Sequence, residues 1–170
     1  MKLLVVSDTH GRYERLSMLL DMHSDADALI FLGDGLNDLG RADAYDRGMS
    51  VIAHRGNCDG LVFLGHYAGI ETSQSFEGFK FFMLHGHTRG VKSGFYGAAV
   101  AAVNKDADLL LFGHTHKAIE KYLPEGTDIE GTLLKKPLRI FNPGSLGDSG
   151  SFGIIDIRGE NILMSHGVCK

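Results

Sequence analysis

Five short apolar runs, each followed by a cluster of small and polar residues, constrain the fold of this chain more than any other feature. The runs occupy residues 3–6, 28–32, 50–53, 79–84 and 109–112. Near-continuous apolar segments of this length are typical of strands that are covered on both faces. Helical patterns lie between them, at Tyr13–Met22, around 38–47 and at Gly94–Val103. This alternation of strand and helix predicts an α/β fold.

Beyond Lys117 the pattern changes to strands joined by turns. The expected strands are 138–142, 152–157 and 162–166, with turn residues at 148–150 and 159–161. We expect these strands to be antiparallel additions to the sheet. No linker, tandem repeat or low-complexity tract interrupts residues 1–170, which predicts a single domain. Residues 60–78 are the least regular stretch, and we expect them to form a surface flap over a site.

Composition and charge exclude several classes of partner. The net charge of −4, with both signs interspersed, argues against a nucleic-acid duplex or an anionic membrane as partner. No apolar run approaches the roughly 20 residues of a membrane span, and the first ten residues do not resemble a signal peptide. Cys58 and Cys169 form no disulfide framework, so we expect a cytoplasmic protein. A homo-oligomer is as compatible with the sequence as a monomer.

The polar clusters at the ends of the runs carry seven candidate metal ligands. They are Asp8, His10, Asp34, Asn57, His85, His114 and His116. Because loops at the carboxyl ends of strands converge in open α/β sheets, we expect these side chains to gather at one edge. Within Asp8-x-His10 and His114-x-His116, an extended backbone would point both side chains the same way. Seven such donors suffice for two divalent metal ions that share a carboxylate.

Charge balance favours the same interpretation. Two divalent cations carry four positive charges and the two aspartates supply two negative ones, while the imidazoles and the amide are neutral. The remaining charge favours a bridging hydroxide and a phosphate oxygen. A metal ion lowers the pKa of bound water from about 15.7 toward 7, and two metals about 3.5–4 Å apart can clamp both oxygens of a displacement at phosphorus.

The motifs resemble, in order, the full set of the calcineurin-like metallophosphoesterases. They are Asp8-x-His10, Gly33-Asp34, Gly56-Asn57-x-Asp59, His85 and Gly113-His114-x-His116. Residues 141–145 (FNPGS) are also similar to a segment of the small YfcE-like phosphodiesterases, so the resemblance extends from residue 5 to about 147. It implies a four-layer α/β/β/α sandwich of two mixed sheets with a site for two divalent metals, most often Mn. Fe, Ni, Co or Zn would also suit these mixed oxygen and nitrogen donors.

The resemblance also implies a role for each ligand. Asp8, His10, Asp34 and His116 hold one metal. Asp34 bridges to the second metal, which is completed by Asn57, His85 and His114. The implied activity is a metal-dependent phosphodiesterase that hydrolyses small phosphodiesters by attack of a hydroxide bridging the two metals, with Asp34 and Asn57 at the reaction centre.

Cys58 marks a departure from the wider superfamily, in which many members have histidine at this position. The YfcE-like branch shares the Gly-Asn-Cys-Asp form. A thiol is a poorer proton donor at neutral pH than imidazolium, so we expect diesters with good leaving groups to be better substrates than alkyl monoesters. His87, two residues beyond His85, is the candidate to replace the missing histidine in proton transfer.

Other interpretations of these residues remain open. The same fold includes the retromer subunit VPS twenty-nine, so the alternative is a protein-interaction scaffold with a vestigial metal site; here no ligand position is lost. Asp38 fits a carboxylate at a helix start better than an outer partner of the site. Asp59 is expected to turn a loop or orient its neighbours. Arg55 and Arg89 are candidates for binding phosphate.

Overall fold

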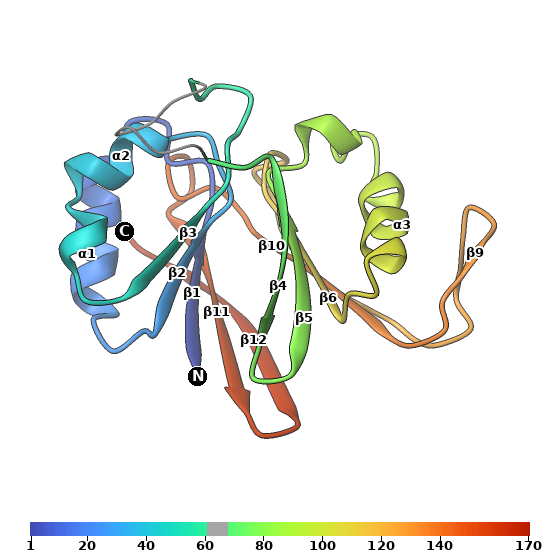
Figure 1. Ribbon diagram of the computed structural model, residues 1–170. Coiled ribbons are helices and arrows are strands. Elements are labelled where there is room, and N and C mark those ends of the chain that lie inside the picture. The colour runs from blue at the N-terminus through green and yellow to red at the C-terminus, as the bar shows by residue number, and fades with distance from the viewer. Residues whose placement is uncertain (61–67) are drawn as a thin grey trace.

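Two five-stranded sheets pack face to face in a computed structural model that describes residues 1–60 and 68–170 (Figure 1). The first sheet has the order β12-β11-β1-β2-β3. Its strands are β1 (Lys2–Val6), β2 (Ala28–Phe31), β3 (Ser50–Ala53), β11 (Ser151–Arg158) and β12 (Asn161–Val168). β1, β2 and β3 are parallel to one another, whereas β11 and β12 run antiparallel to their neighbours.

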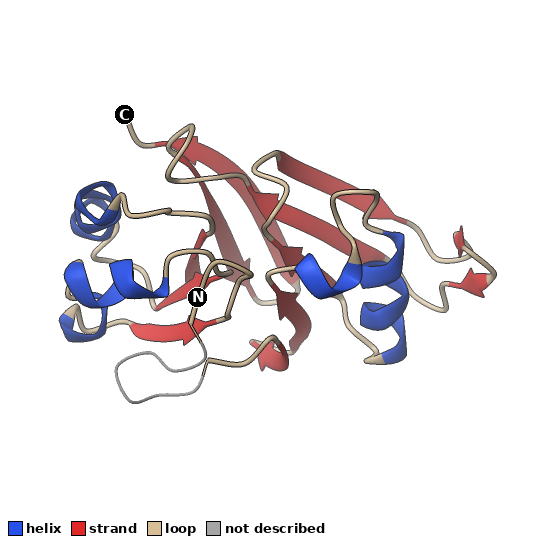
Figure 2. Ribbon diagram, turned by 90° about the horizontal axis from the view of Figure 1, so that it is seen from above, coloured by secondary structure: helices blue, strands red, loops and turns tan. Residues whose placement is uncertain are grey.

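The second sheet has the order β4-β5-β6-β10-β7. Its strands are β4 (Glu71–Phe76), β5 (Phe79–Leu84), β6 (Leu109–Phe112), β7 (Ala118–Leu123) and β10 (Leu138–Pro143), and β8 (Asp128–Ile129) and β9 (Thr132–Leu133) form a separate small hairpin. β5, β6 and β10 are parallel, and β4 and β7 close the edges antiparallel. The helices α1 (Tyr13–Met22) and α2 (Leu36–Arg41) lie outside the first sheet, and α3 (Tyr96–Asn104) lies outside the second (Figures 1 and 2).

Alternation within the apolar runs explains the layers. In β1, Leu3 and Val5 point into the core between the sheets, whereas Leu4 and Val6 pack with Leu16 of α1. β6 behaves in the same way, with alternate residues in the intersheet core and in the core under α3. Both faces of β1 and β6 are therefore buried, which is why the runs 3–6 and 109–112 contain no polar residues. The predicted α/β/β/α sandwich of two mixed sheets is confirmed.

Most predicted elements are present, with three differences. Residues 60–78 are not a simple flap, because Glu71–Phe76 form the edge strand β4; the part of that prediction at 61–67 lies outside the described residues. β10 was expected to be antiparallel, but it pairs parallel with β6 and antiparallel with β7. The strand β7 is absent from the predicted elements, because most of its residues are exposed and carry no apolar run.

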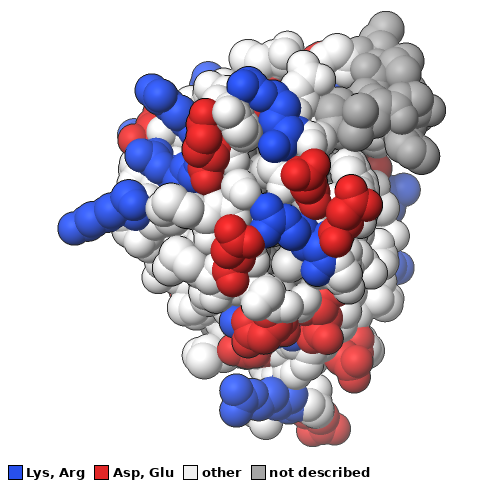
Figure 3. Space-filling view, turned by 90° about the vertical axis from the view of Figure 1, so that its left-hand side faces the viewer, with Lys and Arg blue, Asp and Glu red and all other residues white. Residues whose placement is uncertain are grey.

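The surface charges and the helix lengths bear on the expected partners. Figure 3 shows lysine, arginine, aspartate and glutamate intermixed on the face formed by α1 and α2. In the described part of the chain, no helix has the length and apolarity needed to cross a membrane.

Candidate metal centre

The seven candidate ligands lie in loops that follow the carboxyl ends of β1, β2, β3, β5 and β6, at the upper edge of the molecule in Figure 1. The first sheet supplies Asp8, His10, Asp34 and Asn57, and the second sheet supplies His85, His114 and His116. The site therefore spans the interface between the two sheets, and each sheet contributes only part of it.

Asp8, His10 and His116 form one group of donor atoms. His116 Nε2 lies 3.2 Å from Asp8 Oδ1 and 3.3 Å from His10 Nε2. His10 Nε2 is 3.8 Å from the same Asp8 oxygen. These separations bring two imidazole nitrogens and a carboxylate oxygen around one point, as a transition-metal site requires.

A second group contains Asn57, His85 and His114 together with Asp34. His85 Nε2 lies 3.2 Å from Asn57 Oδ1, 3.1 Å from His114 Nδ1 and 3.4 Å from Asp34 Oδ2. Burial, followed by the charge of His85, lowers the pKa of His114 to about 4. The His114 imidazole is consequently neutral at pH 7, with a lone pair available for a ligand.

Asp34 joins the two groups. Its Oδ2 lies 3.4 Å from His85 Nε2 in the second group and 4.0 Å from His10 Nε2 in the first. Its Oδ1 accepts a hydrogen bond from the backbone N–H of Cys58 at 2.8 Å. Burial disfavours the Asp34 carboxylate, but hydrogen bonds from His85 and Cys58 outweigh it and hold the pKa well below its usual range. Asp34 is thus an anion in the position expected for a shared ligand.

Asp8 provides a test of whether the site fits a cation. Its side chain is fully buried, and Oδ2 accepts hydrogen bonds from Ser7 Oγ at 2.5 Å and from the His114 backbone N–H at 3.0 Å. Its Oδ1, in contrast, is buried with no hydrogen-bond partner among the described residues. Burial accordingly raises the pKa of Asp8. A buried carboxylate oxygen without a donor is costly, and a cation at this point would remove that cost, so the donor set fits a metal.

The backbone at the ligands differs from the predicted extended form. Asp8, His10, Asp34, His114 and His116 all have positive φ, between 45° and 64°. The prediction that i and i+2 spacing acts through extended backbone is therefore wrong. Each pair instead turns through left-handed conformations, which non-glycine residues adopt at a cost of roughly 1–2 kcal/mol each. Such strain, concentrated on five donors, marks this edge as a functional site.

Further side chains and carbonyls orient the imidazoles. His85 Nδ1 lies 2.7 Å from the Leu32 carbonyl oxygen, and His116 Nδ1 lies 2.6 Å from Asp148 Oδ2. In each ring the Nδ1–H donates, which leaves Nε2 facing the other donors. Asp148 is absent from the predicted site. The only signal for it in the sequence is a carboxylate that follows the FNPGS segment, three residues after Ser145.

Asp59 fixes the loops around Asp34, as expected. Its two carboxylate oxygens accept four backbone hydrogen bonds at 2.8 Å, from Asp34, Gly35, Leu36 and Gly56. The approach is so close that a Cβ on Gly56 would lie 2.0 Å from Asp34 Oδ1. Asp59 therefore positions its neighbours through their backbone N–H groups.

Asp38 lies at a helix start, as expected, and in addition contacts the loop that carries His10. It lies in the first turn of α2, and its buried Oδ2 accepts hydrogen bonds from Thr9 Oγ1 at 2.5 Å and from the Gly11 backbone N–H at 2.8 Å. Those two residues flank His10. Asp38 is thus an outer partner of the site, because the β1–α1 loop folds over the start of α2.

The FNPGS segment ties together the loops of both sheets. Asn142 Nδ2 donates to the Gly113 carbonyl at 2.9 Å and to Thr115 Oγ1 at 3.0 Å, beside the His114 and His116 ligands. Ser145 Oγ donates to the Asp8 carbonyl at 2.9 Å. The segment connects the β1 loop to the β6 loop and so fixes their relative position.

The other predicted catalytic residues lie at the rim. Cys58 is exposed, and its thiol accepts a hydrogen bond from Asn57 Nδ2 at 3.2 Å; burial and then Asp34 raise the pKa of that thiol. The His87 ring centroid lies 5.4 Å from that of His85 and 6.2 Å from that of His114. Burial and the charge of His85 lower the pKa of His87.

The two arginines that are candidates for binding phosphate, Arg55 and Arg89, differ in whether their charge is already paired. Arg89 forms a bidentate ion pair with Glu71, with nitrogen to oxygen distances of 2.8 to 3.0 Å, so its charge is already compensated. The Arg55 Nε is buried and has no hydrogen-bond partner among the described residues. Of the two phosphate-binding candidates, Arg55 is the one without a carboxylate partner among the described residues.

Comparison with known proteins gives consistent results. The probable metallophosphoesterase YsnB of Bacillus subtilis (strain 168) is 28% identical over 147 residues, which cover 86% of this chain and 75% of YsnB. A structure of a predicted phosphoesterase from Streptococcus pneumoniae TIGR4 shares 21% identity at a TM-score of 0.70, covering 97% of this chain and 87% of that one.

Two further solved structures share the fold. Vps29 from Entamoeba histolytica, in a single-mutant form, is 20% identical at a TM-score of 0.69, covering 98% of this chain and 91% of that one. An archaeal phosphodiesterase is 20% identical at a TM-score of 0.68, and the match covers 98% of this chain and 99% of that one. The model of the calcineurin-like phosphoesterase superfamily domain matches residues 1–160. With this match over nearly the whole sequence, the chain belongs to the calcineurin-like phosphoesterase superfamily.

Proposed function

We propose that this protein is a cytoplasmic, metal-dependent phosphodiesterase that hydrolyses small phosphodiesters. The observation that carries the proposal is the position of Asp34, whose Oδ2 lies between a His10–His116–Asp8 group and a His85–His114–Asn57 group. A carboxylate shared by two groups of nitrogen and oxygen donors is the arrangement that two divalent cations need.

The residues that would hold the cations are the seven predicted ligands. Asp8, His10, Asp34 and His116 would hold one, and Asp34, Asn57, His85 and His114 the other. When bound, such ions lower the pKa of water and neutralise charge on the phosphate. Manganese is the ion we propose first, because the resemblance to the metallophosphoesterases implies it most often; Fe, Co, Ni and Zn are compatible with the same donors.

The donor set carries protons that a cation would displace. Although burial opposes it, a hydrogen bond that His85 donates to Asp34 and the charges of Asp8 and Asp34 raise the pKa of His85. In the metal-free chain the raised pKa favours the protonated form of the His85 imidazole. Ligands bind metals in their deprotonated forms, so we expect metal binding to release protons.

The rim residues favour diesters with good leaving groups. The raised pKa of the Cys58 thiol keeps it protonated at neutral pH, and a weak acid of this kind gives little help to a departing alkoxide. The lowered pKa of His87 leaves that imidazole mostly neutral, so we assign it the role of a hydrogen-bonding partner for the leaving oxygen. Arg55, whose charge has no carboxylate partner among the described residues, is the proposed contact for a phosphate oxygen.

Hydrolysis of bis-p-nitrophenyl phosphate with added manganese tests the proposal. We expect turnover in the wild type, a metal content approaching two ions per chain, and a loss of at least about a hundredfold in Asp34→Asn, because several kcal/mol of charge stabilisation depend on the shared carboxylate. Asp46→Asn, an exposed aspartate away from the site, is the matched control. Two bound ions without turnover of any diester would overturn the enzyme in favour of the scaffold alternative, which the fold likeness to Vps29 keeps open.

A further inference from the structure

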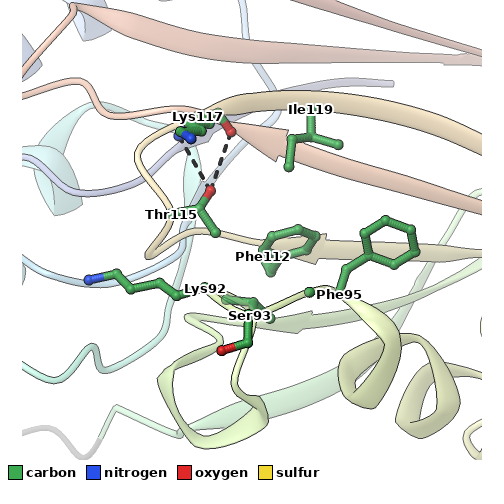
Figure 4. Close-up of a pocket in the computed structure, with 9 residues that line it drawn as sticks. Lys92, Ser93, Phe95, Phe112, Thr115, Lys117 and Ile119 are labelled. Atoms are coloured by element: carbon green, nitrogen blue, oxygen red, sulfur yellow. Dashed lines mark hydrogen bonds between the residues drawn. The ribbon is translucent and has the colours of Figure 1, made fainter.

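A pocket of about 480 Å³ is lined by Thr115, which stands between the ligands His114 and His116 in the sequence (Figure 4). It is bounded by the loop that precedes α3, by the end of β6 and by the start of β7. Phe95, Phe112 and Ile119 form its apolar part. Its volume falls within the range of about 300–1,000 Å³ that is usual for small-molecule sites.

The charge of this pocket has one sign. Lys92 and Lys117 are its only charged lining residues within the described chain, and no aspartate or glutamate lines it. A third cation, Lys121 Nζ, lies 5.7 Å from the centroid of the Phe95 ring. In a chain of net charge −4, two lysines that line one pocket and a third beside one of its aromatic rings favour an anionic ligand.

The pocket and the metal centre share a boundary. Thr115, which lines the pocket, stands in the sequence between the ligands His114 and His116. In Figure 4, Lys92, Thr115 and Lys117 lie on one side of the pocket, and Phe95 and Ile119 lie on the other. The cationic side of the pocket is therefore the side that carries Thr115, and the aromatic ring of Phe95 lies on the other side.

We propose that this pocket binds one organic arm of the phosphodiester and selects arms that carry a planar unsaturated ring. The inference rests on the proposed function, since the phosphate must lie at the histidines. The ring would pack on Phe95 and Ile119, where aromatic faces favour stacking or edge contacts. Lys92 and Lys117 would then face the phosphate charge, as ammonium groups commonly do. The specificity-determining residue is Phe95, because it provides an aromatic ring at the far end.

Binding to the metal-free protein tests this inference without relying on turnover. Chelator-treated protein is titrated with phenyl phosphate and with methyl phosphate, and the amide NMR signals of Ser93, Phe95 and Thr115 are followed. We expect phenyl phosphate to bind at least fivefold more tightly than methyl phosphate. Phe95→Leu, which keeps an apolar side chain and removes the ring, should reduce that preference to less than twofold and leave methyl phosphate unchanged.

Two further variants separate ring recognition from charge recognition. Lys92→Gln should weaken phenyl phosphate and methyl phosphate by the same factor, because both carry the phosphate. Tyr122→Leu removes an exposed aromatic residue that does not line the pocket, and it should leave the phenyl preference intact. The dispersion of the amide spectrum of Phe95→Leu establishes that this variant is folded.

The outcome distinguishes this inference from the proposed function. Equal binding of the two phosphates by the wild type, or an unchanged phenyl preference in folded Phe95→Leu, would overturn the ring-selective pocket and leave the enzyme proposal intact. Absence of diester turnover would overturn the enzyme proposal while the phenyl preference could still be measured. With both proposals correct, Phe95→Leu raises the KM for bis-p-nitrophenyl phosphate at least fivefold and retains most of kcat.

Discussion

His116 Nδ1 lies 2.6 Å from Asp148 Oδ2, so the carboxylate fixes the ring with Nε2 directed at Asp8 and His10. The two residues are 32 positions apart, and the contact exists because the chain after β10 turns back over the β6 loop. A carboxylate behind a metal-binding imidazole sets its tautomer and raises its basicity. The first prediction follows from this pair.

Asp148→Asn should weaken metal binding by about 10–100-fold, as is usual when an outer partner of a ligand is removed. Competition with a chromophoric chelator measures the affinity. The matched control is Glu160→Gln in the exposed β11–β12 turn, which should retain the wild-type affinity. An unchanged affinity in Asp148→Asn would show that His116 needs no such support.

Asp59→Asn should destabilise the fold by about 3 kcal/mol. The carboxylate accepts four backbone hydrogen bonds, and the amide would face two of those N–H groups with its own NH₂. Hydrogen bonds to a charged acceptor contribute roughly 1.5–3 kcal/mol each. Urea unfolding measures the free energy, with Asp46→Asn as the exposed control; equal stability of the two variants would contradict this account.

The variant His10→Gly should have a higher free energy of unfolding than His10→Ala. His10 has a φ of 45°, a left-handed value that costs a residue with a Cβ roughly 1–2 kcal/mol and costs glycine little. We expect chelator-treated His10→Gly to be about 1 kcal/mol more stable than His10→Ala, although both variants lack the imidazole. At the exposed helical position Met18 the order should reverse, with alanine about 1 kcal/mol more stable than glycine. The same order of stability for the glycine and alanine variants at both positions would contradict the claim that the backbone at His10 is strained.

Stability should fall on mild acidification because of His54. Burial is the main cause that lowers the pKa of this fully buried histidine from 6.5 to about 4. Between these two values the unfolded chain binds a proton that the folded chain does not. The free energy of unfolding that depends on a neutral His54 is therefore fully present above about pH 6.5. It is lost as the pH falls toward 4, and the total loss is about 3 kcal/mol.

Urea unfolding of chelator-treated protein from pH 4.5 to 8 measures this dependence. His54→Asn is the informative variant, because an amide can still donate to the Phe31 carbonyl, as His54 Nδ1 does at 3.2 Å. It should be less stable than the wild type at pH 8, with a shallower slope between pH 4.5 and 6.5. Identical slopes would assign the acid sensitivity to other groups.

The sequence predicts those parts of the molecule that depend on burial and on the ends of strands. β1, β2 and β6 are buried on both faces, so their residues must be apolar and the runs are visible. The same logic gathers the seven ligands, because parallel strands end at one edge. β7 escapes prediction, since it is held by its pairing with β10 and carries mainly exposed side chains.

Within the site, the sequence identifies the seven candidate ligands but not the contacts that orient them. The link from Asp148 to His116 depends on a turn of the chain that no local pattern encodes. The left-handed backbone at Asp8 and Asp34 arises because the loops of neighbouring strands crowd together, which local spacing does not reveal. Tertiary contacts of this kind appear only when the two sheets are placed against each other.

Because Asp8, His10, Asp34 and Asn57 come from one sheet and His85, His114 and His116 from the other, a cation held by all of them would cross-link the two halves of the sandwich. A slip of one residue between the sheets, roughly 3.3 Å, would separate the halves of the cluster beyond any coordination distance. Only a chain whose two sheets have docked in the native register can therefore bind the ion tightly. The ion would stabilise correctly assembled chains in addition to its part in the chemistry.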